Sequence, residues 1–286
     1  MIRGGAVHGY TILETMIFLA ITSLLFGSFV SVFGGRQGEV QFTQSTRDAQ
    51  IQVQAIINEV SSGFYPSNSA NTCTVGAGAS AVPTFVATPS VQGTSNQCVF
   101  IGKAMQLGGA SAKDITVISL AARRLNSLNK EASSLREALV TAIPGINVSS
   151  RLQYELYVTR IVVPSVTGQT FGSIVFLTTL PKFQGSTGTL ASGAQRVSFG
   201  AVPQTAIGND VTAATSAVNN LTDLTDPSPG SRQPITINPA SGIYICLADN
   251  QNVASARRKA MIVIGEGASQ TTARLETGNY RADICG

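Results

Sequence analysis

The sequence predicts an α+β protein in which a long N-terminal hydrophobic α-helix packs on a mainly antiparallel β head with one additional helix. Three observations lead to this fold class. Residues 10–33 contain a single charge, Glu14. An amphipathic helical pattern follows them to about residue 62. Short segments rich in β-branched residues, separated by Gly, Pro and Ser, then fill most of the remaining chain.

The composition favours a protein that works outside the cytoplasm or packs against copies of itself. Charged residues make up 12% of the 286 residues, about half the usual share, whereas hydrophobic residues are ordinary at 43%. Ser, Thr, Gly, Ala and Asn replace the missing charges. A formal net charge of +4 is too small, by itself, to indicate a nucleic-acid partner.

Three interpretations compete for the apolar run at residues 10–33. A secretory signal peptide is disfavoured because the run is too long, no small-x-small cleavage site ends it, and the preceding MIRGGAVHG holds one arginine. A plain transmembrane anchor fits the length, since about 20 apolar residues span the hydrocarbon. That interpretation gives Glu14 no purpose, and an unpaired carboxylate inside a membrane is costly.

The stretch Gly9-Tyr10-Thr11-Ile12-Leu13-Glu14 supports a third interpretation, because it resembles the processing site of type IV pilins and type II secretion pseudopilins. The resemblance implies that a prepilin peptidase cleaves between Gly9 and Tyr10 and methylates the new amino group of Tyr10. Residues 1–9 would be the leader, and residues 10–35 a transmembrane helix that later lies in the filament core. The usual proline of the mature helix is absent, and the leader is poor in Lys and Arg.

Under this resemblance, Glu14 has an assembly role. Helical residues four apart share a face, so Glu14 lies one turn from Tyr10. In a staggered filament, its carboxylate can meet the amino terminus of a neighbouring subunit. Because each unpaired buried charge costs several kcal/mol, this contact would penalise a wrong register.

Residues 36–62 are expected to continue the helix as its amphipathic half. One apolar face is predicted, with spacings of three and four, and it would pack on a head formed by residues 63–286. The members of this face are Ala49, Val53, Ile56, Ile57, Val60 and Phe64.

The four cysteines predict two disulfides in an exported protein. Cys73, Cys98, Cys246 and Cys285 form no CxxC pair, so metal-ligand spacing is absent. Four cysteines allow three connectivities, and four free thiols are the alternative. Cys73–Cys98 with Cys246–Cys285 is favoured because each pair brackets one compact segment.

Within the head, the pattern alternates strands and turn-rich stretches. Strands are expected at 98–102, 114–119, 152–163, 173–180, 243–247, 259–264 and 272–276. The Leu and Ala spacing in residues 119–145 predicts the additional helix, ended by Pro144-Gly145. Residues 62–97 and 181–241 are expected to be mostly loop and turn.

The last 45 residues more loosely resemble GspH/FimT-type pseudopilins and minor pilins, in which a hairpin with basic residues precedes a terminal cysteine. Some members of that class bind DNA through a basic C-terminal region. The corresponding residues are Arg257, Arg258, Lys259 and Arg274. Nearby Asp249, Glu266, Glu276 and Asp283 nearly balance them, which favours solvated strand edges over phosphate contacts.

Catalytic chemistry is not indicated. His8, the sole histidine, lies in the leader segment, so a mature chain would lack His-based triads and His zinc sites. No phosphate-binding or nucleophile motif occurs. We therefore expect a non-enzyme without metal or cofactor.

The function expected from the resemblance is that of a structural subunit of a type IV pilus or similar filament, with a minor subunit favoured and a major subunit as the alternative. Its partners would be other pilin subunits, the prepilin peptidase and an inner-membrane assembly platform. It would span the cytoplasmic membrane once with the head outside, and then enter an extracellular pilus used for adhesion, motility or DNA uptake. A type II secretion pseudopilin of the GspH class and a membrane-anchored extracellular binding domain are the alternatives.

Overall fold

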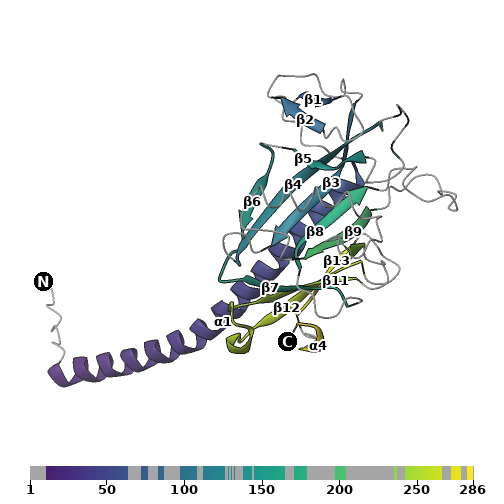
Figure 1. Cartoon of the computed structure of the whole chain (residues 1–286). Coiled ribbons are helices and arrows are strands. Elements are labelled where there is room, and N and C mark those ends of the chain that lie inside the picture. Colours follow the sequence, from purple (N-terminus) through teal and green to yellow (C-terminus); the bar gives the residue numbers. More distant parts are fainter. Residues whose placement is uncertain are drawn as a thin grey trace, which may run out of the picture. The chain divides into compact units, whose positions relative to one another are not determined.

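The computed structural model combines an N-terminal apolar helix, a short second helix and a large antiparallel sheet (Figure 1). Contacts divide the chain into two compact units, Met1–Gln44 and Ser45–Gly286, which are described separately. The structure describes residues 11–63, 72–76, 83–86, 97–107, 112–125, 128, 130, 132, 138–143, 145–164, 171–178, 197–203, 235–236, 242–265, 272–277 and 282–285.

Helix α1 (Ile12–Ser61) is one continuous element of 50 residues. It passes through Gly27, Gly34 and Gly35 without a break. It ends at Ser61, and Gly63 just beyond it has a φ of 66°, a left-handed conformation that glycine adopts without steric cost. The Gly63 N–H donates to the Val60 carbonyl at 3.2 Å and so satisfies a group that the helix end leaves open.

Within the unit Ser45–Gly286, α1 buries the apolar face predicted from the sequence. Val53, Ile57 and Val60 are at most 1% exposed, and Ala49 and Ile56 are also buried. These positions recur every three or four residues, so they form one stripe on the helix. Phe64, the last predicted member of the stripe, lies outside the described residues.

The head contains a two-stranded sheet and, in the described part, an 11-stranded sheet, both with antiparallel pairing. The small sheet pairs β1 (Thr72–Val75) with β2 (Pro83–Val86). The strands of the large sheet are β3 (Cys98–Leu107), β4 (Asp114–Arg123), β5 (Thr141–Ala142), β6 (Val148–Arg151), β7 (Tyr157–Val162), β8 (Phe171–Thr178), β9 (Val197–Pro203), β10 (Ile235–Thr236), β11 (Ile243–Ala248), β12 (Lys259–Ile264) and β13 (Ala273–Glu276).

The large sheet has two halves. One half has the order β13-β12-β11-β7, and the other contains β8 between β3 and β9. In the described residues, the pair Ile161–Phe171 joins β7 to β8 and so links the halves. Strand β4 pairs with β3 along its length, with β6 at its N-terminal end and with β5 near its C-terminal end. Strand β4 therefore has β3 on one side and both β5 and β6 on the other.

Each half of the sheet has its own apolar packing. Residues of β3, β4, β8 and β9 pack with Ala132, Ala138 and Val140. In the other half, Tyr244 and Cys246 of β11 pack with Met261 and Val263 of β12. Cys285 in α4 (Ala282–Cys285) covers this second cluster.

Two disulfides hold peripheral elements to the large sheet. Cys73 of β1 is bonded to Cys98 at the start of β3, and Cys246 of β11 is bonded to Cys285 of α4. These are the pairs favoured from the sequence. Both half-cystines of the second bond are buried, so this bond also belongs to the apolar cluster under α4.

The predicted helix at residues 119–145 is wrong at both ends. Ser119–Arg123 belong to β4, where they pair with β3 as far as Arg123–Cys98, and Thr141–Ala142 form β5. Leu120, Ala121 and Ala122 are consecutive and all buried in this part of the sheet. The strand therefore shows no alternation of apolar and polar residues, and the Leu and Ala spacing was interpreted as helical. A strand buried on both faces loses its alternating pattern.

The stretches predicted as loop contain more strand than expected. Strands β1 and β2 lie within residues 62–97, and β9 and β10 lie within residues 181–241. Strand β9 pairs with β8 over most of its length. Its sequence VSFGAVP is short and interrupted by glycine, so tertiary pairing rather than local propensity sets its conformation.

The disulfides generate a stability prediction. The double variant Cys246→Ala/Cys285→Ala should lower the free energy of unfolding by about 2–4 kcal/mol, because it releases a long loop and opens a packed cluster. Cys73→Ala/Cys98→Ala should instead release the β1–β2 hairpin with a smaller effect on global unfolding. Denaturant unfolding of the full chain in detergent measures both, and equal losses would contradict this difference.

Candidate functional site

The N-terminus of α1 places Glu14 in a capping arrangement. Thr11 precedes the helix, and its Oγ1 accepts a hydrogen bond from the backbone N–H of Glu14 at 3.3 Å. The Thr11 carbonyl accepts the first helical bond, from the N–H of Thr15. Thr11 was missed as a site residue, although the T-x-x-E spacing is a known signal for a helix start.

The predicted processing residues are only partly within the described chain. Gly9 and Tyr10 lie outside it. Glu14 is exposed in the first turn of α1, where a carboxylate is favoured by the helix dipole. Among the described residues, Glu14 has no ion-pair partner.

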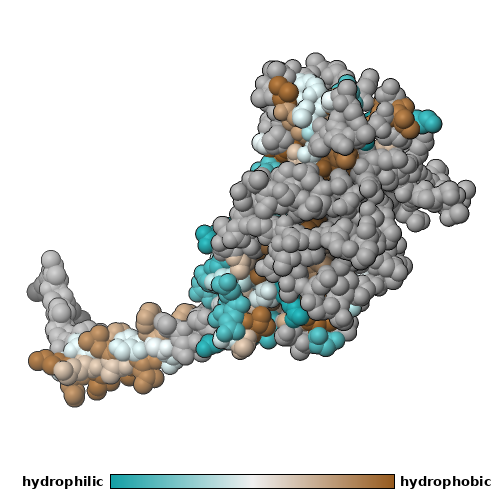
Figure 2. Space-filling model, viewed as in Figure 1, coloured by the Kyte–Doolittle hydropathy of each residue, from teal (hydrophilic) through white to brown (hydrophobic). Residues whose placement is uncertain are grey.

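The first half of α1 is long and apolar enough to cross a membrane. Residues Ile12–Phe29 have a mean hydropathy of 1.9, and none of this window is buried within the chain. Its large exposed residues are Ile12, Leu13, Met16, Ile17, Phe18, Leu19, Ile21, Leu24, Leu25, Phe26 and Phe29 (Figure 2). This surface needs an apolar cover that the described chain does not supply.

The hydroxyl groups in this apolar stretch are satisfied within the helix itself. Thr22 donates to the Phe18 carbonyl at 2.9 Å, Ser23 to Leu19 at 2.7 Å and Ser28 to Leu24 at 2.8 Å. Thr15 donates to the Ile12 carbonyl in the same way. None of these hydroxyls needs water as a hydrogen-bond partner, so they are compatible with an apolar environment. The carboxylate of Glu14 differs from them because it carries a charge.

An ion pair between a buried lysine and a half-buried glutamate fixes the second half of α1 on the head. Lys103 lies in the middle of β3 with its side chain 7% exposed, and its ammonium group is bonded to the carboxylate of Glu59 in α1. An unpaired lysine at this depth would be strongly unfavourable. The pair therefore selects one position of the helix along the sheet.

Two glutamines of α1 bind the edge strand β13. Gln50 donates to the Ala273 carbonyl at 2.8 Å, and the Ala273 N–H donates to Gln54 at 2.7 Å. The two side chains lie four residues apart and therefore on one flank of the helix. They satisfy backbone groups at the sheet edge, which would otherwise be open to pairing with another chain.

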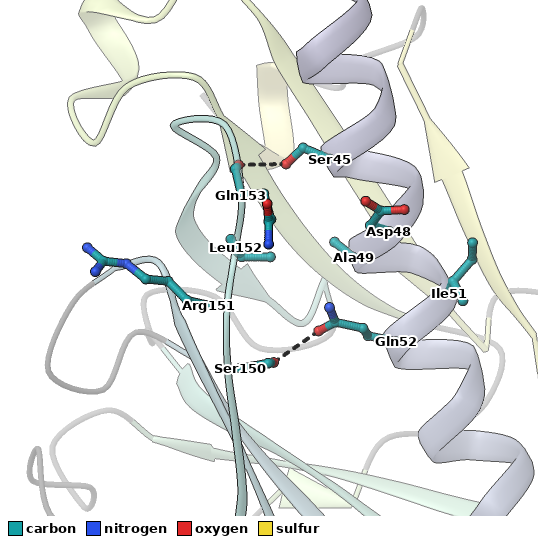
Figure 3. Close-up of a pocket in the computed structure, with 9 residues that line it drawn as sticks. All are labelled: Ser45, Asp48, Ala49, Ile51, Gln52, Ser150, Arg151, Leu152 and Gln153. Atoms are coloured by element: carbon teal, nitrogen blue, oxygen red, sulfur yellow. Dashed lines mark hydrogen bonds between the residues drawn. The ribbon is translucent and has the colours of Figure 1, made fainter.

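The opposite flank of α1 borders a groove of about 420 Å³ (Figure 3). Two hydrogen bonds cross it: Ser45 donates to the Gln153 carbonyl at 2.9 Å, and Ser150 donates to Gln52 at 3.2 Å. Its complete lining is Ser45, Asp48, Ala49, Ile51, Gln52, Ser150, Arg151, Leu152 and Gln153.

A tight turn follows the groove. Tyr154 and Glu155 have φ values of 51° and 56°, and the Leu156 N–H donates to the Gln153 carbonyl. Lys113 stabilises this turn through a 2.7 Å ion pair with Glu155 and a position 4.5 Å from the ring centre of Tyr157. The hydrogen bond from Lys113 is the main cause of a lowered pKa of Glu155.

The basic residues considered for DNA contact lie at the end of the sheet that carries β12 and β13. The hairpin between β11 and β12 contains the 3-10 helix η3 (Val253–Ser255), followed by Arg257, Arg258 and Lys259. Arg258 lies 3.8 Å from Asp249, and Arg274 of β13 lies 2.6 Å from Glu276. Carboxylates thus oppose Arg258 and Arg274.

No group of metal-ligating side chains occurs among the described residues. Comparison with models of protein families, with curated proteins and with solved structures found no match to this chain. The features of the described chain that bear on function are the two different surfaces of helix α1 and the carboxylate of Glu14.

The Lys103–Glu59 ion pair predicts an asymmetric mutational response. Glu59→Ala should lower the free energy of unfolding by about 2–3 kcal/mol, because Lys103 remains buried without its partner. The double variant Glu59→Leu/Lys103→Met should recover most of this loss. Asn58→Ala, at the neighbouring exposed position, should cost less than about 0.5 kcal/mol. A double variant as unstable as Glu59→Ala would contradict this role for the pair.

The turn at Glu155 predicts a pH dependence. The pKa of Glu155 is lower in the folded state than in the unfolded state. The contact with Lys113 therefore stabilises the fold at pH values above the unfolded-state pKa. This stabilisation is lost as the pH falls through the folded-state pKa. In an NMR titration, Lys113→Met should return the Glu155 pKa towards its ordinary value. Lys130→Met is the control. An unchanged Glu155 pKa in Lys113→Met would show that Lys113 is not the cause.

Proposed function

We propose that this protein is a structural subunit of a type IV pilus or related filament, anchored in the cytoplasmic membrane before assembly and held in the filament by α1. The observation that carries the proposal is the carboxylate of Glu14 on the most apolar part of the helix. Ile12–Phe29 are unburied within the chain, and Glu14 has no ion-pair partner in its described part.

The two surfaces of α1 support this function. In the apolar half, residues on every side of the helix are exposed, as suits a segment surrounded first by lipid and then by other helices. From Ser45 onwards, one stripe is buried and the head is attached. Such a subunit can exchange its apolar environment without rearranging the head.

Glu14 would give the assembly its register. When lipid is replaced by neighbouring helices, a buried carboxylate is tolerated if a cation lies within reach. The amino group created by cleavage before Tyr10 would supply that cation from the next subunit. The Thr11 cap would fix the first turn of the helix, from which the Glu14 side chain extends.

The alternative of an ordinary membrane-anchored domain makes a different prediction for Glu14. Glu14→Ala should leave the protein in the membrane but reduce filament incorporation at least about tenfold, because the registering charge is lost. Counting filaments by electron microscopy and measuring membrane-bound protein in the same cells separate these two effects.

Glu39→Ala is the matched control, since Glu39 is an exposed carboxylate on α1 outside the window Ile12–Phe29. We expect it to assemble normally. Normal filament numbers in Glu14→Ala, or equal losses in both variants, would overturn the role assigned to Glu14.

A further inference from the structure

Thr11 sets the residue at which helix α1 begins. Its Oγ1 accepts a hydrogen bond from the backbone N–H of Glu14 at 3.3 Å, and its carbonyl accepts the N–H of Thr15 at 3.2 Å. Both bonds are those of an N-cap residue, and the first helical residue is accordingly Ile12. The start of the helix therefore depends on one side-chain oxygen.

The N–H of Glu14 has an alternative acceptor. In an α-helix each N–H bonds to the carbonyl four residues earlier, so a helix that began further upstream would direct this group to the Tyr10 carbonyl. The cap competes with such an extension, because it satisfies the Glu14 N–H from a side chain. Removing the Thr11 oxygen would therefore favour an earlier helix start.

The nearest upstream residue of a type that makes a good N-cap is Gly9. Glycine is about as favourable at this position as threonine, whereas tyrosine is not among the preferred residues. With Gly9 as the N-cap, its carbonyl would accept the N–H of Leu13. That carbonyl belongs to the peptide bond between Gly9 and Tyr10, which is the predicted cleavage site.

We propose that Thr11 is a positioning residue for proteolytic processing, because its cap keeps the Gly9 carbonyl out of the helix and open to the peptidase. Hydrolysis adds water across the bond and gives a carboxylate on Gly9 and an amino group on Tyr10. Proteases act on backbone that secondary structure does not hold, so a carbonyl bonded within a helix would first have to be released. This inference rests on the proposed function, in which cleavage creates the cation for Glu14.

Two substitutions separate the shape of Thr11 from its oxygen. Thr11→Val keeps the branched shape and removes the acceptor, so cleavage of the full chain in its own cells should slow about fivefold, the population change expected from losing a typical N-cap. Thr11→Asn changes the shape but keeps a capping oxygen, and it should be cleaved at the wild-type rate. Pulse-chase labelling followed by intact-mass measurement gives both rates.

Thr15→Val is the matched control. The Thr15 hydroxyl donates to the Ile12 carbonyl and caps no backbone N–H, so we expect an unchanged rate of cleavage. The helix start itself gives a second readout, measured by NMR on the full, uncleaved chain in detergent. The Cα shift of Tyr10 should move towards helical values in Thr11→Val and stay unchanged in Thr11→Asn and Thr15→Val.

The possible failures are distinguishable. If the wild-type chain keeps residues 1–9, the proposed function fails and this role of Thr11 fails with it. If the wild-type chain is cleaved and Thr11→Val is cleaved equally fast, the role of Thr11 alone is overturned. The same holds if Thr11→Asn is as slow as Thr11→Val, or if Thr11→Val slows cleavage without a change at Tyr10, because the peptidase would then recognise the threonine side chain directly.

Discussion

Helix α1 must satisfy two different environments along one unbroken backbone of 50 residues, and the other features depend on this constraint. Its first half is apolar and unburied within the chain, whereas its second half buries a narrow stripe in the head. The exposed apolar side chains of the first half are unfavourable in water, and contact with lipid or with another protein surface would remove them from it. The proposed transfer from membrane to filament follows from this unequal burial.

The polar contacts of α1 from Ser45 onwards fix this part of the helix on the head. Glu59 binds Lys103, Gln50 and Gln54 hold β13, and Ser45 and Gln52 cross the groove. These contacts come from different flanks of the helix and reach different strands, so rotation or sliding would break several together.

Helices and strands could be predicted from the sequence where the spacing of apolar residues matches the face that the element buries. The stripe from Ala49 to Val60 could be predicted because a half-buried helix repeats every three or four residues. The strands rich in Val and Ile, such as β11 and β12, were predicted for a similar reason. Residues 119–123 were assigned to the wrong element because long-range pairing with β3 overrides the helical preference of Ala and Leu. The Lys103–Glu59 pair joins residues 44 positions apart, and no local pattern indicates it.

We propose that Glu14 belongs to a processed terminus and not to a permanent anchor. Intact-mass measurement of the protein purified from its own cells distinguishes the two. We expect a chain that begins at N-methylated Tyr10, with residues 1–9 removed. A mature protein that retains Met1 would contradict it, because Glu14 would then lack the neighbouring amino group that its proposed role requires.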